Sequence, residues 1–278
     1  MKIGFFITAR LKSSRLKRKI VLDLNGKTVL DRVIERCKAT AGVDGVVLCT
    51  SANPQDSELY QYALKHGIEF YIGSENDVLR RLLDAGVYYG YDAFASITAD
   101  NPLFCIRAIE QVIKKYKSEQ FDFGFLHNMP IGCMPYMLRT DALKVACYMK
   151  AQTDTEIWGP FVRRPDFFRI ADFRIANSPF DESRRLTCDY PEDLQLLRQI
   201  YNAFPEDSIP KVKDVCELLN EKPEYWKIIE KCEQKRLNKA EIKAINAAFD
   251  KQKESGEAFA KEHGIRIACG HRELTVDI

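Results

Sequence analysis

Short apolar runs alternate with longer amphipathic stretches along the first half of the chain. The runs are rich in β-branched and aromatic residues and predict strands at 2–8, 45–51, 69–72 and 93–98. The stretches repeat apolar residues every three or four positions and predict helices at 28–40, 56–66, 76–89 and 103–117. Strands alternating with such helices indicate βαβ units and a mostly parallel sheet, and the continuously apolar strands indicate helices on both faces.

After about residue 120 the pattern is mixed. It predicts further strands at 121–127, 167–176 and 185–189 and helices at 140–150, 191–203, 211–219 and 225–232. The segment 128–136 reads as a loop rich in Met, Pro and Gly, and 167–176 alternates like an exposed strand. We expect Thr140 to cap its helix and regard about 125–185 as a β-rich insert in a domain of residues 1–236.

The last stretch, 237–278, differs in composition from the rest. Asn238 and Glu241 have the spacing of a capping box and predict a highly charged helix to about residue 263. A short apolar run ending at Cys269 follows. We interpret the stretch as a helical extension of unknown role, which either makes oligomer or partner contacts or is a solvated terminal helix.

Composition narrows the class of protein. The 278 residues include 42 basic and 40 acidic ones, a net charge of +2, which argues against a nucleic-acid binder that works by bulk electrostatics. No apolar run approaches the ~20 residues of a membrane span, and the apolar start is too short for a signal peptide. Nine cysteines without a Cys-x-x-Cys pair indicate neither a disulfide framework nor a zinc site, so we expect a cytoplasmic protein.

A strongly basic loop follows the first strand. It holds six cations and no acid within ten residues, namely Arg10, Lys12, Arg15, Lys17, Arg18 and Lys19. Open parallel sheets bind ligands at the carboxyl ends of their strands, and cations together with backbone N–H groups suit a triphosphate. The alternative is a solvated basic loop, which is the usual meaning of a charge run.

Two common nucleotide motifs are absent. Gly26-Lys27-Thr28 resembles the end of a P-loop, but Val21 stands where the first glycine would be required. No G-x-G-x-x-G follows the first strand either. We expect Gly26 to close a turn before the helix at Thr28.

Four segments, in order, carry a family resemblance. They are Ile7–Lys19 with its Gly26-Lys27 turn, Gly73–Arg81, Thr98–Leu103 and Arg185–Leu194. Together they resemble the CMP-KDO synthetase and acylneuraminate cytidylyltransferase group, and most of all its spore-coat polysaccharide branch. The first departs from the family motif at Lys17-Arg18, where Pro-Gly is common, and Phe104-Cys105 stand where the branch often has an acid.

The resemblance implies a Rossmann-like, GT-A-like α/β fold, a dimerisation role for the insert and hence a homodimer. It implies transfer of CMP from CTP to an acidic sugar or sugar phosphate for surface glycans. From the net charge and the short apolar runs, we expect no nucleic-acid or membrane partner. The implied nucleotide-binding residues are Ala9, Arg10, Ser14, Arg15, Lys19, Asp77, Arg81 and Asp100. Of these, Arg10, Lys19 and Asp100 would be catalytic, and Asp100 and Asp189 would bind Mg²⁺. The acceptor pocket would include His127, Asn128, Arg163 and Arg164.

Each of these residues also has a plainer interpretation. Asp100 and Asp189 both precede a proline at a predicted helix start and could be helix caps. Arg80 and Asp84 could form an i,i+4 pair on the helix that carries Arg81. His127 could be a structural histidine.

Two other functions compete with CMP transfer. A GT-A glycosyltransferase has a similar nucleotide half, but it usually needs an Asp-x-Asp motif, and Asp100 is followed here by Asn101-Pro102. A non-catalytic nucleotide-binding assembly protein, with 237–278 as the recruiting segment, is the second alternative.

Overall fold

The alternating pattern of the first half folds into a parallel sheet. The computed structural model describes residues 1–178 and 180–278. Strand β1 (Ile3–Thr8) lies between β4 (Gly45–Ser51) and β6 (Ala93–Thr98), parallel to both, and β5 (Glu69–Gly73) continues the sheet beside β4. The connecting helices are α1 (Val29–Lys38), α2 (Leu59–His66), α3 (Val78–Tyr89) and α4 (Ile106–Glu119). These elements confirm the predicted α/β class and parallel sheet.

Helices cover both faces of this sheet. Successive strand residues point to opposite faces, so Phe5 packs in one apolar core with residues of α1, α2 and α4, and Phe6 packs in the other with residues of α3. Every residue of β1 is buried, as expected for a strand covered on both sides.

The second half extends the sheet. Its strands are β7 (Phe123–His127), β8 (Tyr136–Arg139) and β9 (Arg169–Ile175), and its first helices are α5 (Thr140–Met149) and the short α6 (Gly159–Val162). With β10 (Gly270–Val276) from the C-terminus, the sheet order is β10-β9-β7-β8-β6-β1-β4-β5, and β8 is antiparallel to both of its neighbours. The segment 125–185 thus contains the helices α5 and α6 as well as the strands β8 and β9. That it is an insert, and that it serves homodimerisation, stay predictions.

Three local expectations were wrong, and one strand was not expected. That strand, β8, begins at the last residue of the predicted loop 128–136 and is too short for its period to be seen. Arg139, not Thr140, is the cap residue of α5, because the Thr140 hydroxyl instead donates to the Tyr91 carbonyl at 2.6 Å. The predicted strand at 185–189 makes only a single bridge, from Arg185 to Ile131. Strand β9 is mostly buried, since both cores and a neighbouring strand cover it.

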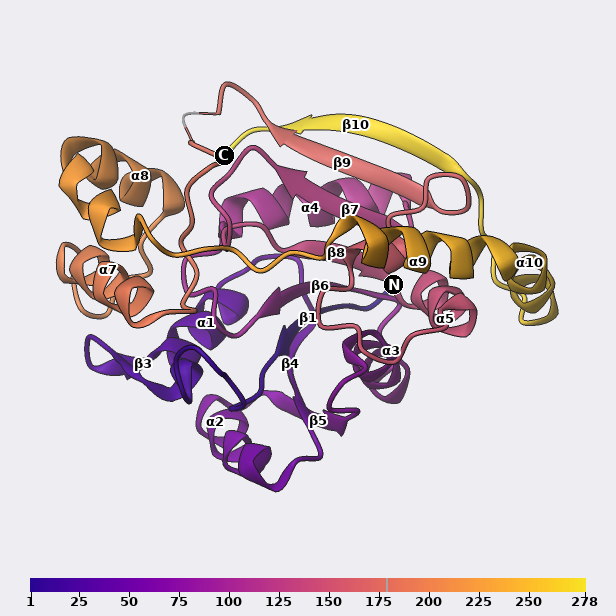
Figure 1. Cartoon of the computed structure of the whole chain (residues 1–278), viewed down its shortest axis with the longest axis horizontal. Coiled ribbons are helices and arrows are strands. Elements are labelled where there is room, and N and C mark those ends of the chain that lie inside the picture. The colour runs from indigo at the N-terminus through magenta and orange to yellow at the C-terminus, as the bar shows by residue number, and fades with distance from the viewer. Residues whose placement is uncertain (179) are drawn as a thin grey trace.

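That neighbouring strand comes from the C-terminus. After α7 (Pro191–Asn202), α8 (Val212–Glu221) and the 3₁₀ helix η3 (Pro223–Ile229), the chain forms α9 (Lys239–Lys251), α10 (Lys253–Glu262) and β10 (Gly270–Val276). Strand β10 pairs in parallel with β9 at the sheet edge (Figure 1). The expected helical extension thus also contains a strand of the main sheet, and the charged helix is interrupted at Gln252. Its strand was missed because His271, Arg272 and Glu273 are polar and exposed.

The hairpin before α1 has the sequence of a tight turn. The turn joining β2 (Asp23–Leu24) and β3 (Lys27–Thr28) places Asn25 and Gly26 at positive φ, the Asn-Gly pattern of a tight hairpin. This confirms the turn predicted at Gly26.

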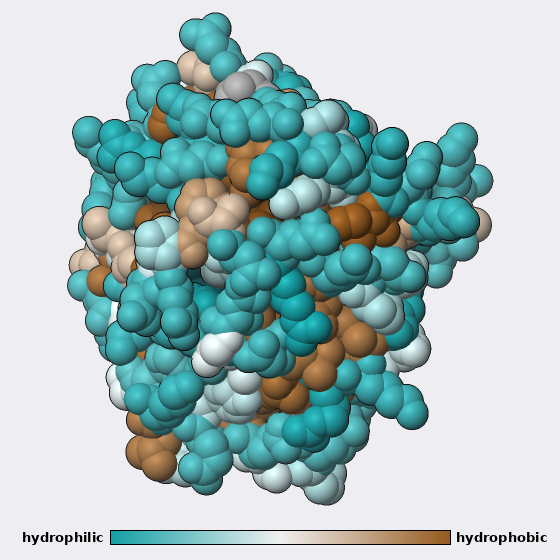
Figure 2. Space-filling view, turned by 90° about the vertical axis from the view of Figure 1, so that its left-hand side faces the viewer, coloured by the Kyte–Doolittle hydropathy of each residue, from teal (hydrophilic) through white to brown (hydrophobic). Residues whose placement is uncertain are grey.

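Figure 2 shows the side of the molecule formed by α7 and α8 as mostly hydrophilic, with separate apolar patches. Among the described residues, no helix has the length and apolar character needed to cross a membrane.

Helix α9 packs on the domain through two buried apolar residues, Ile245 and Phe249, which belong to the same apolar core as Phe6. Phe249 is buried against Phe167 and Phe168. Replacing Phe249 with alanine is expected to lower the free energy of unfolding by about 3–4 kcal/mol, because it removes a large buried side chain and leaves a cavity. Chemical denaturation measures the effect, with the exposed Lys243→Ala of the same helix as control, expected within about 0.5 kcal/mol of wild type. An equal loss in both variants would contradict the packing described.

Candidate active site

The basic loop follows the carboxyl end of β1, and a buried aspartate binds its backbone. Asp56, 1% exposed, accepts hydrogen bonds from the Leu11 N–H at 2.7 Å and from the Ser51 hydroxyl. The loop backbone is thus fixed, while the side chains of Lys12 and Lys17 are exposed. Asp56 was not predicted as a site residue, because its only signal in the sequence is its place in the turn after Pro54.

Lys19 lies at the centre of the site. Its ammonium donates to the carboxylate of Asp100 and, at 2.7 Å, to that of Asp189. Asp100 follows β6, and Asp189 precedes α7, so two segments nearly ninety residues apart meet at one cation. A backbone bond from the Cys188 N–H to the Asp100 carbonyl, 2.8 Å, holds the segments side by side. The structure therefore brings together the three residues that the sequence predicted to share a site.

The cap interpretation of the two aspartates is wrong. The cap residue of α4 is Cys105, five residues beyond Asp100. The cap residue of α7 is Tyr190, and the reciprocal capping contacts involve Asp193. Asp100 and Asp189 therefore do not cap the helices that follow them, and both carboxylates reach Lys19.

Asp189 is held by three cations. Its carboxylate lies 2.8 Å from Arg15 Nη2 and 3.0 Å from Arg185 Nη2, in addition to Lys19. Burial by itself would raise the pKa of the Asp189 carboxyl, but Lys19, Arg15 and Arg185 outweigh it and hold the pKa below its usual range. Burial would likewise lower the pKa of the Lys19 ammonium, but the two aspartates raise it overall. The site thus contains fixed charges of both signs.

Asp193 fixes the backbone of Asp189 and orients Arg185, which also contacts Asp189. One of its carboxylate oxygens accepts from the Asp189 N–H at 2.8 Å and the Tyr190 N–H at 3.0 Å, and it lies 3.0 Å from Arg185 Nη2. Burial raises the pKa of the Asp193 carboxyl. Asp193 lies within the last matching segment, where it was expected only to suit the first turn of the helix.

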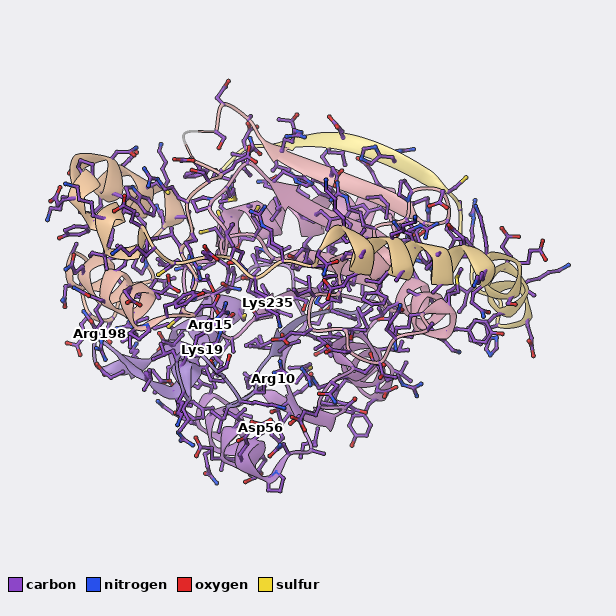
Figure 3. The ribbon with its side chains drawn as sticks, viewed as in Figure 1. Arg10, Arg15, Lys19, Asp56, Arg198 and Lys235 are labelled. Carbon is purple, nitrogen blue, oxygen red and sulfur yellow. The ribbon has the colours of Figure 1, made fainter. Side chains whose placement is uncertain are left out.

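Arg10 lies on the other side of the loop. Its guanidinium pairs with Glu156 at 2.8 Å, and the second oxygen of Glu156 lies 3.6 Å from Lys235 Nζ. In the view of Figure 3, Lys235 lies above Arg10, and Arg15 and Lys19 lie to its left. Burial would raise the pKa of the Glu156 carboxyl, but Arg10 and Lys235 lower it overall. Lys235 was also missed, because it follows the matching segments in a stretch without a recognisable pattern.

The other predicted nucleotide residues have different surroundings. Asp77 caps α3 by accepting from the Arg80 N–H at 3.1 Å, and it pairs with Lys150. Arg81 is buried and donates to the Ser74 carbonyl at 2.6 Å, and burial lowers the pKa of its guanidinium. The i,i+4 pair of Arg80 with Asp84 is present at 2.8 Å. Asp77 and Arg81 thus shape the loop before α3.

Two residues of the basic segment differ in burial. Ala9 is buried, and its N–H donates to the Cys49 carbonyl at 3.0 Å, which continues the pairing of β1 with β4. Ser14 is exposed in the middle of the loop. Ala9 therefore fixes the start of the loop, and Ser14 is accessible to a ligand.

Two of the four predicted acceptor residues share a buried partner. His127 Nε2 lies 2.9 Å from Asp172, and Arg163 Nη2 lies 2.6 Å from the other oxygen of the same carboxylate. His271 of β10 contacts Asp172 as well, at 2.7 Å. Burial would raise the pKa of the Asp172 carboxyl, but the two histidines and Arg163 lower it overall.

The other two predicted acceptor residues are engaged elsewhere. Asn128 has a φ of 50°, and its amide exchanges bonds of 2.9 and 2.8 Å with the backbone of Ile175. Arg164 pairs with Asp166 at 2.9 Å and with Asp250 of α9. Asn128 thus joins the ends of β7 and β9, and Arg164 holds α9 against the segment before β9. A role of these two residues in acceptor binding stays a prediction.

Comparisons with known proteins show which family the chain resembles. A family model described as cytidylyltransferase matches residues 5–254. The spore coat polysaccharide biosynthesis protein SpsF of Bacillus subtilis is 24% identical over 80% of this chain and 95% of its own length. The 3-deoxy-manno-octulosonate cytidylyltransferase of Aeromonas salmonicida is 30% identical over 52% of this chain and 57% of its own.

A solved structure gives the same fold. A cytidylyltransferase from Leptospira borgpetersenii superposes with a TM-score of 0.74 at 23% identity, covering 86% of this chain and all of that one. At this identity the likeness shows the fold alone, but the family model spans most of the chain, including the basic loop and both aspartates. This chain therefore belongs to the cytidylyltransferase family.

Proposed function

We propose that this protein transfers CMP from CTP to an acidic sugar or sugar phosphate, releasing pyrophosphate, with Mg²⁺ as its metal. The observation that carries the proposal is the pair of carboxylates, Asp100 and Asp189, that meet at Lys19 beside the basic loop. Nucleotidyl transfer needs cations near the leaving pyrophosphate and a divalent metal that stabilises the negative charge of the phosphates. The basic loop would supply the cations, and Asp100 and Asp189 would hold the metal.

The donor atoms fit a magnesium ion. Mg²⁺ prefers carboxylate oxygens, keeps several waters and needs only one or two protein ligands, which Asp100 and Asp189 would supply. When bound, the ion would supply positive charge to the phosphate oxygens during transfer.

The side chains of the loop provide the rest of the chemistry. Arg10, Arg15 and Lys19 bind the triphosphate, and the loop N–H groups orient it. Lys19 changes partners in this scheme: it holds the two carboxylates together before the ligand arrives, and then donates to the phosphates. Because its pKa is raised, Lys19 stays charged across the working pH range.

Pyrophosphate release tests the function. The purified chain is incubated with each of the four NTPs, Mg²⁺ and a panel of acidic sugars that includes 3-deoxy-manno-octulosonate. Release that requires CTP and an acid supports the proposal. Release with every NTP would remove the cytidine part, and no release with any NTP would overturn the transferase proposal and favour a non-catalytic role. Transfer from a nucleotide sugar instead would identify a glycosyltransferase.

Lys235 offers a finer test of the phosphate site. It shares Glu156 with Arg10, so a triphosphate bound to Arg10 would lie within reach of its ammonium. Replacing Lys235 with alanine is expected to raise the KM for CTP about 3- to 5-fold with little change in kcat. This increase corresponds to the loss of one exposed charge contact, which contributes up to about 1 kcal/mol to binding. Lys231→Ala, an exposed cation four residues earlier, is the control. Equal KM values for both variants would remove Lys235 from the site.

The cysteines suit a cytoplasmic location, which is part of the proposal. All nine are free thiols, and free thiols persist in a reducing compartment.

A further inference from the structure

A cavity of about 430 Å³ lies beside the carboxyl end of β7. Its lining includes Phe125, His127, Tyr136 and Arg163 from the main domain and Ile242 and Asn246 from α9. Small-molecule sites commonly have this size and this mixture of aromatic and polar lining. Part of the wall therefore comes from the C-terminal segment 237–278, whose role the sequence left open.

The cavity lies at the carboxyl end of the parallel strands, as does the proposed metal site. Strands β6 and β7 run in the same direction, separated by the antiparallel β8. Asp100 follows the end of β6, and His127 is the last residue of β7, so both lie at the carboxyl ends of the parallel strands. Adjacent strands are ~4.8 Å apart, so the two ends are separated by about two strand spacings.

The polar end of the cavity is preorganised. Arg163 is 42% exposed, lies over the Phe125 ring with its guanidinium carbon 4.9 Å from the ring centroid, and pairs with Asp172 at 2.6 Å. His271 of β10 and His127 contact the same carboxylate. Asp172 and Phe125 therefore fix the orientation of Arg163, and a fixed guanidinium suits a carboxylate ligand.

The α9 wall is rigid as well. Ile242 and Asn246 are four residues apart and lie on one side of the helix. Between and beyond them, Ile245 and Phe249 are buried against the sheet. Arg164 fastens the next turn by pairing with Asp250. A wall held in this way can select a ligand by shape.

We infer that α9 completes the acceptor site and that Ile242 and Asn246 select the acceptor, a small sugar acid whose carboxylate meets Arg163. This inference rests on the proposed function. Ile242 limits the size of the sugar at the apolar side of the cavity, and the Asn246 amide hydrogen-bonds its hydroxyls. The segment 237–278 thereby belongs to the substrate site.

Two variants test the wall. Ile242→Trp fills the cavity and Asn246→Ala removes the amide, while Lys243→Ala changes an exposed residue of the same helix. With CTP and 3-deoxy-manno-octulosonate, or whichever acid of the panel turns over best, we expect Ile242→Trp to raise the acceptor KM at least 10-fold and Asn246→Ala about 5-fold. The KM for CTP should stay within 2-fold of wild type in both, and Lys243→Ala should match wild type in both constants. Unchanged acceptor KM values in the two cavity variants would overturn the inference.

A binding measurement separates this inference from the proposed function. Calorimetric titration of the same acids into the protein without nucleotide reports the cavity directly. If the wild type binds an acid and Ile242→Trp loses that binding, the wall is supported even where no CTP is turned over. If no acid of the panel binds the wild type and none supports turnover, the inference is overturned. Equal melting temperatures of the three variants and the wild type show that a loss of binding is not a loss of folding.

Discussion

Replacing Lys19 with methionine is expected to lower kcat/KM for CTP by a factor on the order of 10²–10³, the cost of removing one fixed charge from a site where negative charge develops. Lys19 is the one side chain that contacts both Asp100 and Asp189 among the described residues. Methionine keeps most of the length of the chain but no charge. Because Arg15 and Arg185 still neutralise Asp189, the variant should fold.

Lys17→Met is the matched control, since it removes a cation from the same loop at an exposed position. It should retain at least half of the wild-type rate. A similar loss in both variants would mean that the loop acts only through its summed charge, and a fully active Lys19→Met would remove Lys19 from the mechanism.

The Lys19 variant also has a readout that does not depend on turnover. In the absence of nucleotide, the ammonium neutralises the two carboxylates that we propose as metal ligands. Its removal should therefore strengthen the binding of Mn²⁺, a spectroscopic substitute for Mg²⁺, measured by electron paramagnetic resonance. Weaker Mn²⁺ binding by Lys19→Met than by wild type would contradict the exchange of partners proposed for Lys19.

The parallel half of the fold could be predicted because each of its signals is local. The predicted bounds of β4 and β6 agree with the structure, since continuous apolar runs of that length fit buried parallel strands. Strand β8 and strand β10 could not be found in this way. Their residues are few or polar, and they form strands because neighbouring β7 and β9 offer them free backbone groups.

Some residues of the site could be predicted from local sequence, and others could not. Asp100 and Asp189 could be proposed from their segments, because each comes next to a strand end or helix start at the ligand edge of the sheet. Lys235 and Asp172 could not, because their importance depends on contacts across long separations, to Glu156 in one case and to His127 and His271 in the other. Asn128 and Arg164 also make contacts that the sequence does not reveal, to the backbone of Ile175 and to Asp250 of α9. Their role in acceptor binding stays a prediction.

Replacing Asp100 with asparagine is expected to reduce kcat at least as strongly as the Lys19 change, by a factor on the order of 10³. Asparagine keeps the shape of the side chain and its hydrogen bond with Thr98, but it removes one of the two negative charges proposed to hold the metal. Lys19 then remains paired with Asp189 alone.

Pyrophosphate release measured against Mg²⁺ concentration tests this effect, with Asp207→Asn as the control at an exposed acid. Asp100→Asn should need several-fold more Mg²⁺ for half-maximal rate and should bind Mn²⁺ more weakly, whereas a merely structural role would change the melting temperature and leave the metal dependence unaltered. Since Asp189 is pinned by three cations and Asp100 is not, Asp100 is the carboxylate more able to turn towards a metal, and its loss should weaken Mn²⁺ binding more than the loss of any other acid at this edge of the sheet.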